Sequence, residues 1–545
     1  MIYTELTKKA LRLCFDAHKD QLDKSGMPYV FHPFHLAEQM DTEESVTVAL
    51  LHDVIEDTDL SLEDLRQMGY PTAVINALAL MTHEPDISYM DYVARISTNE
   101  LATKVKLADL RHNSDLSRLD KVDEKAIARV EKYAKAIRLL ENIHNTPEYV
   151  AKKKADAEGY KDNIRGCLIG GAAGDALGYP VEFYGVTDIY GDYGLHGITE
   201  YELDRHSGKA LISDDTQMTL FTANGLLFGN TRGHLRGIAA SHSSYIALAY
   251  KDWYMTQTTK FENKPTDPHF YTAYMSWLCD VPELYNRRAP GNTCLDALSD
   301  LKNVRRSDFI DPPLNNSKGC GGVMRVAPLA LIQWRNMDDL IMEAARTAAV
   351  THGHPLGYMT ASVLCYIINR VVFLVDYPID LKKIVIEAKE AVCERFKDNR
   401  YTGQLAEIID RAIELTENDE SDMTNIQLLG AGWVAEEALA IAIYCSLRYQ
   451  HDFSSGIIAA VNHDGDSDST GAITGNILGA LVGYEAIDAK WKRDLEIADV
   501  ILEMADDLCY GCVISEYEPY TDAIWKNKYL YARWKMHVDG SGPAH

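Results

Sequence analysis

Residues 463–479 read His-Asp-Gly-Asp-Ser-Asp-Ser-Thr-Gly-Ala-Ile-Thr-Gly-Asn-Ile-Leu-Gly. The glycines at 471, 475 and 479 recur every four residues, so on a helix they lie along one face. A face without side chains lets another helix approach closely. Residues 166–183 carry a second set of glycines, at 166, 170 and 174, with the same spacing. Each run therefore predicts a helix packed very close to a neighbour.

The first run also begins with an acidic, hydroxyl-rich cluster. In extended chain Asp466 and Asp468 point the same way, and their carboxylates together with neighbouring hydroxyls suit a hard cation such as Mg²⁺. A similar cluster, Ser213-Asp214-Asp215-Thr216, lies about 250 residues upstream. The two clusters could close on one metal site, and the alternative is a pair of solvated acidic turns. The glycine-rich run favours a site, because it holds Asp175 and Glu182, and an unpaired charge among small apolar residues is costly.

Five blocks, in order, resemble the ADP-ribosylglycohydrolase family, also called the dinitrogenase-reductase-activating glycohydrolase family, over residues 162–490. The blocks are Gly-Asp-Ala-Leu-Gly (174–178) with Glu182, Ser-Asp-Asp-Thr-Gln-Met (213–218), Gly-Cys-Gly-Gly-Val-Met-Arg-Val-Ala-Pro (319–328), Thr351-His352, and Gly-Asp-Ser-Asp-Ser (465–469). The family more often has Thr where this chain has Ser213 and Ser469. Serine keeps the hydroxyl, so the metal site is expected to survive this departure.

The resemblance implies hydrolysis at ribose C1″, with release of ADP-ribose from a modified acceptor. It also implies two Mg²⁺ ions that hold the distal ribose hydroxyls and a water. The implied metal ligands are Ser213, Asp214, Asp215, Asp466, Asp468 and Ser469. Glu182 and Asp466 are the implied acid–base groups.

The loop at residues 315–328 is glycine-rich, and glycines let backbone amides approach an anion closely. By the resemblance this anion is the pyrophosphate of ADP-ribose, and the implied substrate-binding residues are Ser317, Gly319, Gly321 and His352. Taken alone, the glycines equally fit a tight structural loop, and His352 fits a capped turn.

Helical periodicity dominates the first 150 residues, where the informative feature is Ala-Leu-Leu-His-Asp-Val-Ile-Glu-Asp-Thr (49–58). On a helix His52 stacks near Glu56, and Asp53 near Asp57. His52 and Asp53 offer an imidazole and a carboxylate to one metal. Glu56 and Asp57, one turn further on, can handle a proton or a metal-bound water.

With His32 before it and Asp109…Asn113 after it, this segment resembles the HD-type phosphohydrolase domain of the RelA/SpoT alarmone enzymes. The resemblance implies that His32, His52, Asp53 and Asp109 hold one Mn²⁺ and that Glu56 and Asp57 serve the hydrolytic water. It implies that Lys24 and Asn113 contact a phosphorylated nucleotide such as (p)ppGpp. The family commonly reads Ala-Asp-Arg-Leu-His-Asn, whereas residues 108–113 read Ala-Asp-Leu-Arg-His-Asn.

These observations predict an all-α protein with two helical domains, an HD-type bundle followed by an ADP-ribosylglycohydrolase-like orthogonal helical bundle. The expected boundaries are residues 1–147 for the first domain, 148–161 for a polar linker, 162–508 for the second domain and 509–545 for a C-terminal extension. The extension is aromatic-rich, and a surface element or dimer contact is expected there, with a lid over the nucleotide pocket as the alternative. A helix is expected over residues 495–508.

The composition narrows the class of protein. With 81 acidic and 54 basic residues the formal charge is −27, which argues against a non-specific nucleic-acid binder. The start lacks a signal-peptide hydrophobic region, and the most apolar stretch, residues 361–375, is predicted to be a buried helix too short to span a bilayer. Cys509 and Cys512 are the one Cys-x-x-Cys pair, and reduced thiols in a cytoplasmic protein without a membrane partner are expected.

The sequence leaves three roles open. The first is a bifunctional hydrolase that acts on an ADP-ribosylated protein, nucleic acid or small molecule and on a phosphorylated nucleotide. The second is an antitoxin or immunity protein that reverses toxin modifications with the same chemistry. The third is a protein whose first domain only binds a nucleotide and regulates the other. The oligomeric state stays undetermined.

Overall fold

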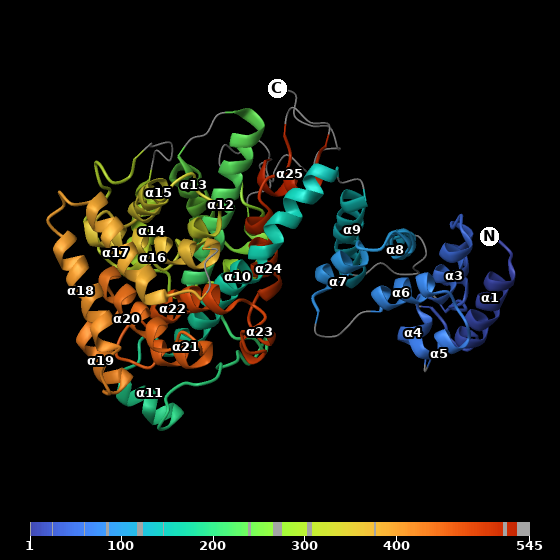
Figure 1. Ribbon diagram of the computed structural model, residues 1–545, viewed down its shortest axis with the longest axis horizontal. Coiled ribbons are helices and arrows are strands. Elements are labelled where there is room, and N and C mark those ends of the chain that lie inside the picture. The colour runs from blue at the N-terminus through green and yellow to red at the C-terminus, as the bar shows by residue number, and fades with distance from the viewer. Residues whose placement is uncertain are drawn as a thin grey trace. The chain divides into compact units, whose positions relative to one another are not determined.

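The protein is all-α in the residues that its computed structural model describes (Figure 1). Within those residues, pairing between extended segments is limited to isolated bridges, such as the one between Gly319 and Val434. The expected fold class is therefore confirmed. The described residues are 2–23, 26–58, 60–82, 87–116, 124–144, 147–237, 241–264, 275–301, 308–374, 378–515 and 520–530.

The chain divides into two compact units. Unit 1 comprises Met1–Glu148 with Asp522–Ile524, and unit 2 comprises Tyr149–Thr521 with Trp525–His545. Each unit has its own hydrophobic core.

Unit 1 is built around α3, which is buried from Ser45 to Leu51. Thr42 begins this helix by accepting a hydrogen bond from the Ser45 amide (3.1 Å), an N-cap that fixes the register of the buried run. The helices of unit 1 are α1 (Glu5–His18), α2 (Phe31–Glu38), α3 (Glu43–Leu51), α4 (Val54–Asp57), α5 (Leu62–Gln67), α6 (Thr72–Met81), α7 (Tyr89–Ile96), α8 (Glu100–Asn113) and α9 (Glu124–His144).

The remaining helices lie in unit 2, except that α10 and α25 each begin with residues of unit 1. Those that bear on its site are α10 (Glu148–Gly178), η2 (Tyr179–Val181), α12 (Asp214–Arg236), η6 (Cys320–Gly322), α20 (Ala435–Arg448) and α22 (Ser467–Val482). The others are α11 (Val186–Tyr193), α13 (His242–Thr258), η3 (Phe261–Asn263), η4 (Trp277–Asp280), η5 (Pro282–Tyr285), α14 (Asn292–Asp300), η7 (Ala327–Leu331), α15 (Met337–Ala349), α16 (Pro355–Phe373), α17 (Leu381–Arg395), α18 (Thr402–Leu415), α19 (Asp422–Leu429), α21 (Phe453–Val461), α23 (Lys490–Arg493), α24 (Ala498–Tyr510) and α25 (Ala523–Tyr529).

The two glycine runs pack against each other, backbone to backbone. A Cβ built on Gly166 would lie 2.2 Å from the carbonyl oxygen of Gly479, and one on Gly170 would lie 2.3 Å from that of Gly475. The close packing expected for each run is thus confirmed, and α10 and α22 are each other's neighbour. This contact brings the C-terminal end of α10 next to the N-terminal end of α22.

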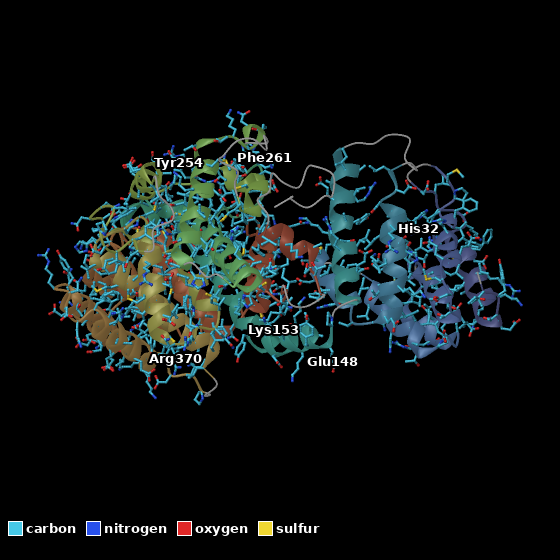
Figure 2. The ribbon with its side chains drawn as sticks, turned by 90° about the horizontal axis from the view of Figure 1, so that it is seen from above. His32, Glu148, Lys153, Tyr254, Phe261 and Arg370 are labelled. Atoms are coloured by element: carbon cyan, nitrogen blue, oxygen red, sulfur yellow. The ribbon has the colours of Figure 1, made fainter. Side chains whose placement is uncertain are left out.

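The segment 148–161, expected to be a linker, is helical instead and forms the first part of α10. Its Ala, Lys and Glu residues are strong helix formers, which favour continuation of the helix over a flexible connection. Its polar side chains are tied to the rest of unit 2, since Lys153 donates to the carbonyl of Cys512 (3.0 Å) and Lys161 to the hydroxyl of Tyr510 (2.9 Å). Figure 2 labels Glu148 and Lys153 on this helix.

Three other expectations need correction. Most of the apolar stretch lies in α16, which is buried as expected, with 83% of its apolar window inside the structure. The expectation that this helix is too short is wrong, since its 19 residues could cross a membrane by length and composition. The C-terminal extension is not only a surface element, because Trp525 and Tyr529 are buried and the indole of Trp525 donates to Thr231 (2.9 Å).

The helix expected over 495–508 is α24, which begins later, at Ala498. All ten cysteines are unpaired.

Candidate functional site

In unit 2 both acidic clusters lie at helix N-termini. Ser213 is the N-cap of α12 and accepts a hydrogen bond from the Asp215 amide (3.2 Å), and Asp466 is the N-cap of α22 and accepts one from the Ser469 amide (3.3 Å). Asp468 therefore lies in the first turn of a helix, so the expectation of an extended chain through 466–468 is wrong. Unpaired amides at a helix N-terminus favour negative charge, which helps to hold these carboxylates in place.

Asp175, near the end of α10, fixes the start of α12. Its carboxylate accepts hydrogen bonds from the amides of Ser213 (3.0 and 3.1 Å) and Thr216 (3.1 Å), and from the Thr216 hydroxyl. Burial raises the pKa of Asp175 to about 6, and these hydrogen bonds oppose the rise. Asp175 thus orients Asp214 and Asp215 rather than offering free oxygens of its own.

The electrostatics of the pocket show that the two clusters lie within reach of each other. Burial, and then neighbouring carboxylates, raise the pKa of Asp215 well above its usual range, with Asp466 among the neighbours. Burial raises the pKa of Asp468 in the same way, with Asp215 as the first neighbouring charge. Burial likewise raises the pKa of Asp214 to about 8. Four carboxylates from two distant segments therefore share one buried region, which we call the acidic pocket (Asp214, Asp215, Asp466, Asp468).

Glu182, which follows η2, is 7% exposed and belongs to the same region. Burial raises its pKa to about 9, and Asp466, Asp214 and Asp175 contribute in that order. Its Oε2 and the Oδ2 of Asp215 are buried, and neither makes a hydrogen bond within the described part of the chain. Buried carboxylate oxygens without a donor are what a pocket built for cations presents.

Cys320 also contacts the acidic pocket. Its Sγ donates to Oδ2 of Asp466 at 2.7 Å, and burial raises the pKa of the thiol well above its usual range.

The glycine loop is held from both sides. The Cys320 amide donates to the carbonyl of Trp433 (3.2 Å), and the Gly319 amide donates weakly to the Ser317 hydroxyl (3.4 Å). His352, expected at the substrate, lies beneath the loop and is 2% exposed, with its ring 2.9 Å from a Cβ built on Gly321. Burial lowers the pKa of His352 to about 3, so the ring is neutral and supports the loop by packing.

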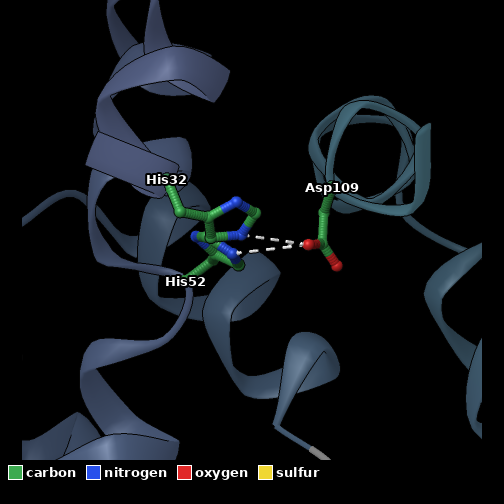
Figure 3. Close-up of side chains that lie close together, drawn as sticks. All are labelled: His32, His52 and Asp109. Atoms are coloured by element: carbon green, nitrogen blue, oxygen red, sulfur yellow. Dashed lines mark ion pairs between the residues drawn. The ribbon is translucent and has the colours of Figure 1, made fainter. Parts of the chain in front are cut away.

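In unit 1, His32 from α2, His52 after α3 and Asp109 from α8 converge (Figure 3). Nε2 of His32 lies 3.2 Å, and Nε2 of His52 3.9 Å, from Oδ1 of Asp109. The donor atoms of these three residues all lie within 4.8 Å of one another, and in the described residues no other His, Cys, Asp and Glu group does so. In the acidic pocket, by contrast, no three carboxylates have oxygen atoms that all lie within 4.8 Å of one another. Asp53 completes the cluster, since its Oδ2 lies 3.0 Å from Nε2 of His52.

The surroundings of this histidine cluster orient its members. Nδ1 of His52 contacts the carbonyl of Ala49 at 2.9 Å, an arrangement that keeps Nε2 free for a metal. The Tyr29 hydroxyl donates to Asp53 (2.6 Å), and Lys106 pairs with the second oxygen of Asp109 (2.9 Å). Burial opposes a charge on His52, yet the carboxylates of Asp53 and Asp109 outweigh it and raise the pKa of His52 to about 9.

The expected neighbours of the histidine cluster are only partly as predicted. The Asn113 amide donates to Oδ1 of Asp109 (2.6 Å) and so supports a proposed ligand, and its contact with a nucleotide stays a prediction. The continuous helix expected through 52–57 is interrupted, because α3 ends at Leu51 and α4 begins at Val54. Glu56 and Asp57 are exposed on α4. Lys24 lies outside the described residues.

The sequence profile of ADP-ribosylglycohydrolases matches residues 156–516. The chain belongs to the ADP-ribosylglycohydrolase family. The match spans the acidic pocket, Glu182 and the glycine loop, and unit 2 is accordingly a hydrolase of this family, whose members use a dinuclear metal site.

Two relatives illustrate the similarity. The uncharacterized protein YegU of Escherichia coli K12 is 25% identical, over 67% of this chain and 99% of its own length. The ADP-ribosyl-[dinitrogen reductase] glycohydrolase of Rhodospirillum rubrum is 23% identical, over 64% of this chain and 95% of its own.

Solved structures give weaker likenesses. An ADP-ribosylglycohydrolase-related protein complex is 23% identical with a TM-score of 0.42, over 65% of this chain and 98% of that one. A structure described as "A metazoan ortholog of SpoT hydrolyzes ppGpp and plays a role in starvation responses" is 22% identical with a TM-score of 0.24, over 27% of this chain and 90% of that one. Neither TM-score reaches 0.5, so the function of unit 1 has to be inferred from its own geometry.

Proposed function

We propose that unit 2 hydrolyses the bond between ribose C1″ of ADP-ribose and a modified acceptor. The observation that carries this proposal is the acidic pocket beside Glu182, where four carboxylates are buried and where Oε2 of Glu182 and Oδ2 of Asp215 have no hydrogen-bond donor in the described part of the chain. A bond forms between a water oxygen and C1″, the C1″–acceptor bond breaks, and the acceptor leaves with a proton. Nearby carboxylates stabilise the positive charge that develops at C1″.

The residues of the acidic pocket fit two Mg²⁺ ions. Oδ2 of Asp215 is buried without a donor in the described part of the chain, and with the neighbouring carboxylates and the hydroxyls of Ser213 and Ser469 it makes the all-oxygen donor set that a hard cation prefers. When bound, the ions would hold the distal ribose hydroxyls and lower the pKa of a water. The proposed ligands are Ser213, Asp214, Asp215, Asp466, Asp468 and Ser469.

Glu182 is the proposed proton donor to the leaving acceptor. Because burial and its neighbours raise its pKa to about 9, the carboxyl carries a proton at neutral pH. Asp466, across the pocket, is the proposed group that orients the attacking water. Ser317, Gly319 and Gly321 would receive the pyrophosphate, with His352 supporting the loop from below.

For unit 1 we infer a phosphohydrolase that acts on a phosphorylated nucleotide. His32, His52, Asp53 and Asp109 would hold one Mn²⁺, with Glu56 and Asp57 serving the hydrolytic water. The exposed Lys132, whose ammonium lies over the ring of Tyr89 (4.0 Å to the centroid), supports such a ligand. An ammonium group can bind a phosphate, and an aromatic ring beside it can stack on a nucleotide base.

The test measures the two activities on the full-length chain. Wild type with Mg²⁺ is expected to release ADP-ribose from ADP-ribosylated peptides, and Asp468→Asn is expected not to.

Wild type with Mn²⁺ is expected to release phosphate or pyrophosphate from (p)ppGpp or NADPH, and Asp53→Asn is expected not to. Mn²⁺ binding without turnover of any nucleotide would instead favour a regulatory unit 1. An antitoxin role would leave both activities intact and would show as protection of cells against an ADP-ribosylating toxin.

A further inference from the structure

A buried ion pair lies beside the segment that leads into α12. The guanidinium of Arg288 donates two hydrogen bonds to the carboxylate of Glu496, from Nη1 to Oε2 and from Nη2 to Oε1, each of 3.2 Å. The two side chains are 12% and 8% exposed. Because a guanidinium and a carboxylate joined by two hydrogen bonds are fixed in orientation as well as in distance, this pair can hold the backbone around it.

Both members of the ion pair bind the backbone of one residue, Ile212. Oε2 of Glu496 accepts a hydrogen bond from the Ile212 amide (3.3 Å), and Nη1 of Arg288 donates to the Ile212 carbonyl (3.3 Å). The Glu496 amide also donates to the carbonyl of Ala210 (3.0 Å). Residues 210–212 are therefore fixed in place directly before the N-cap of α12.

The loop that begins at Arg288 holds Asp214 itself. The Asp214 amide donates to the Arg288 carbonyl (3.1 Å), and Oδ2 of Asp214 accepts a hydrogen bond from the Gly291 amide (3.3 Å). Asp214 is the first residue of α12, where an amide has no partner within the helix. The loop over 288–291 thus contacts both the amide and the carboxylate of Asp214, so a shift of this loop would move a proposed Mg²⁺ ligand.

Each member of the ion pair is followed by a residue with a strained backbone. Ala289 has a φ of +49° and Ile497 a φ of +47°, and among the described residues they are the only ones other than glycine with a positive φ. This conformation is unfavourable for a residue with a Cβ, above all for a β-branched one. Such strain persists only where the surrounding structure holds it, and at both positions the ion pair is directly adjacent.

We propose that Arg288 and Glu496 form a clamp that positions Asp214 to bind Mg²⁺. This inference rests on the proposed function of unit 2. The clamp fixes the segment before α12 and keeps the loop over 288–291 in its strained shape, so that Asp214 is held from both sides. Arg288 and Glu496 are positioning residues, because they act through Asp214.

The first test compares two buried ion pairs. Arg288→Met removes the guanidinium of the clamp and keeps a long side chain. Arg165→Met does the same to the pair of Arg165 with Asp506, which also has two hydrogen bonds (2.6 Å each) and side chains that are 13% and 23% exposed. Both variants are expected to melt at a lower temperature than wild type.

Mg²⁺ affinity, measured by calorimetry, separates the two variants. Only Arg288→Met is expected to bind Mg²⁺ more weakly, by about 10- to 100-fold, which is the usual effect of removing a residue that orients a metal ligand. Arg165→Met is expected to bind Mg²⁺ as wild type does. Equal losses of affinity in the two variants, or no loss in Arg288→Met, would overturn the proposal.

The second test uses the strain at Ala289. Glycine adopts a positive φ at little cost, so Ala289→Gly lets the loop keep its shape without the ion pair. The double variant Arg288→Met/Ala289→Gly is therefore expected to recover part of the Mg²⁺ affinity that Arg288→Met loses. An affinity as weak as that of Arg288→Met would show that Arg288 does not act by shaping the loop, and the clamp would be overturned.

The third test needs neither metal nor turnover. Hydrogen exchange over residues 210–216 can be followed by mass spectrometry in the absence of Mg²⁺. We expect faster exchange there in Arg288→Met than in wild type or in Arg165→Met, and equal rates in all three proteins would overturn the clamp. If wild type bound no Mg²⁺ and released no ADP-ribose, the proposed function would fail, and the exchange rates would still decide whether the ion pair holds this segment.

Discussion

Gly174 of α10 and Gly471 of α22 touch through their backbones, so that a Cβ at Gly174 would lie 1.9 Å from the carbonyl oxygen of Gly471. This contact joins the helix that ends near Glu182 to the helix that begins at Asp466. Gly174→Ala should force the helices apart and lower the free energy of unfolding by about 1–3 kcal/mol or more. Thermal unfolding, with Mg²⁺ affinity as a second readout, would measure the change.

The same helix provides the control. A Cβ at Gly159 would meet no heavy atom within 4 Å, so Gly159→Ala should stabilise the protein by about 0.5–1 kcal/mol through helix propensity. If both variants unfolded at the same temperature, the backbone contact between α10 and α22 would not matter for stability.

Glu182→Gln tests the assignment of the proton donor. The amide cannot donate as an acid does, so kcat should fall by about 10²–10⁴-fold while Mg²⁺ still binds. Turnover and metal affinity should be measured on the same preparation. Full turnover with bound metal would remove Glu182 from the acid–base role.

The pH dependence of the acidic pocket follows from its raised pKa values. Asp214 and Glu182 have pKa values of about 8 and about 9, above those of the unfolded chain. Their contribution to stability is therefore present below the ordinary carboxyl pKa and is lost as the pH rises through about 8 to 9. The melting temperature in EDTA should fall between about pH 6 and pH 9.

Mg²⁺ should reverse this trend, because it replaces the protons of the carboxylates and binds more tightly as they ionise. The rise in melting temperature on adding Mg²⁺ should thus grow with pH. Asp214→Asn should reduce that growth. Parallel melting profiles with and without Mg²⁺ would show that these carboxylates do not bind the ion.

The histidine cluster of unit 1 can be tested separately. His52→Ala should abolish stoichiometric Mn²⁺ binding and the release of phosphate from a nucleotide, and it should leave ADP-ribose release unchanged because the acidic pocket holds its own ligands. His35→Ala is the matched control, since His35 is exposed and its ring stacks on His112 (4.3 Å). Loss of Mn²⁺ in both variants would mean that the fold, and not the ligand, had been disturbed.

The sequence predicts the helical class and the close packing of each glycine run, because both depend on local spacing. It does not show that Gly166 meets Gly479 or that Asp175 holds Ser213, since these are contacts between distant segments. The extended chain expected at 466–468 fails because Asp466 caps a helix, a role that its position before an acidic first turn also fits.

Other contacts of the site cannot be predicted from the local spacing of residues in the sequence. The ion pair of Arg288 with Glu496 and the contact of Cys320 with Asp466 arise only when four segments fold together. For His352 the motif did identify a residue of the site. Its buried position beneath the glycine loop, however, was not predicted from the sequence. The hydrogen bond from Asn113 to Asp109, four residues earlier on the same helix, was not predicted from the sequence, and the contact of Asn113 with a nucleotide stays a prediction.

The measurement that tests the central claim most directly is mass-spectrometric detection of free ADP-ribose after incubation with Mg²⁺. The substrates are arginine-linked and serine-linked ADP-ribosylated proteins, and Asp214→Ala is the control. We predict that wild type releases ADP-ribose and that Asp214→Ala does not. Equal release by the two proteins, or release by neither from any acceptor, would contradict the account of the acidic pocket as a glycohydrolase centre.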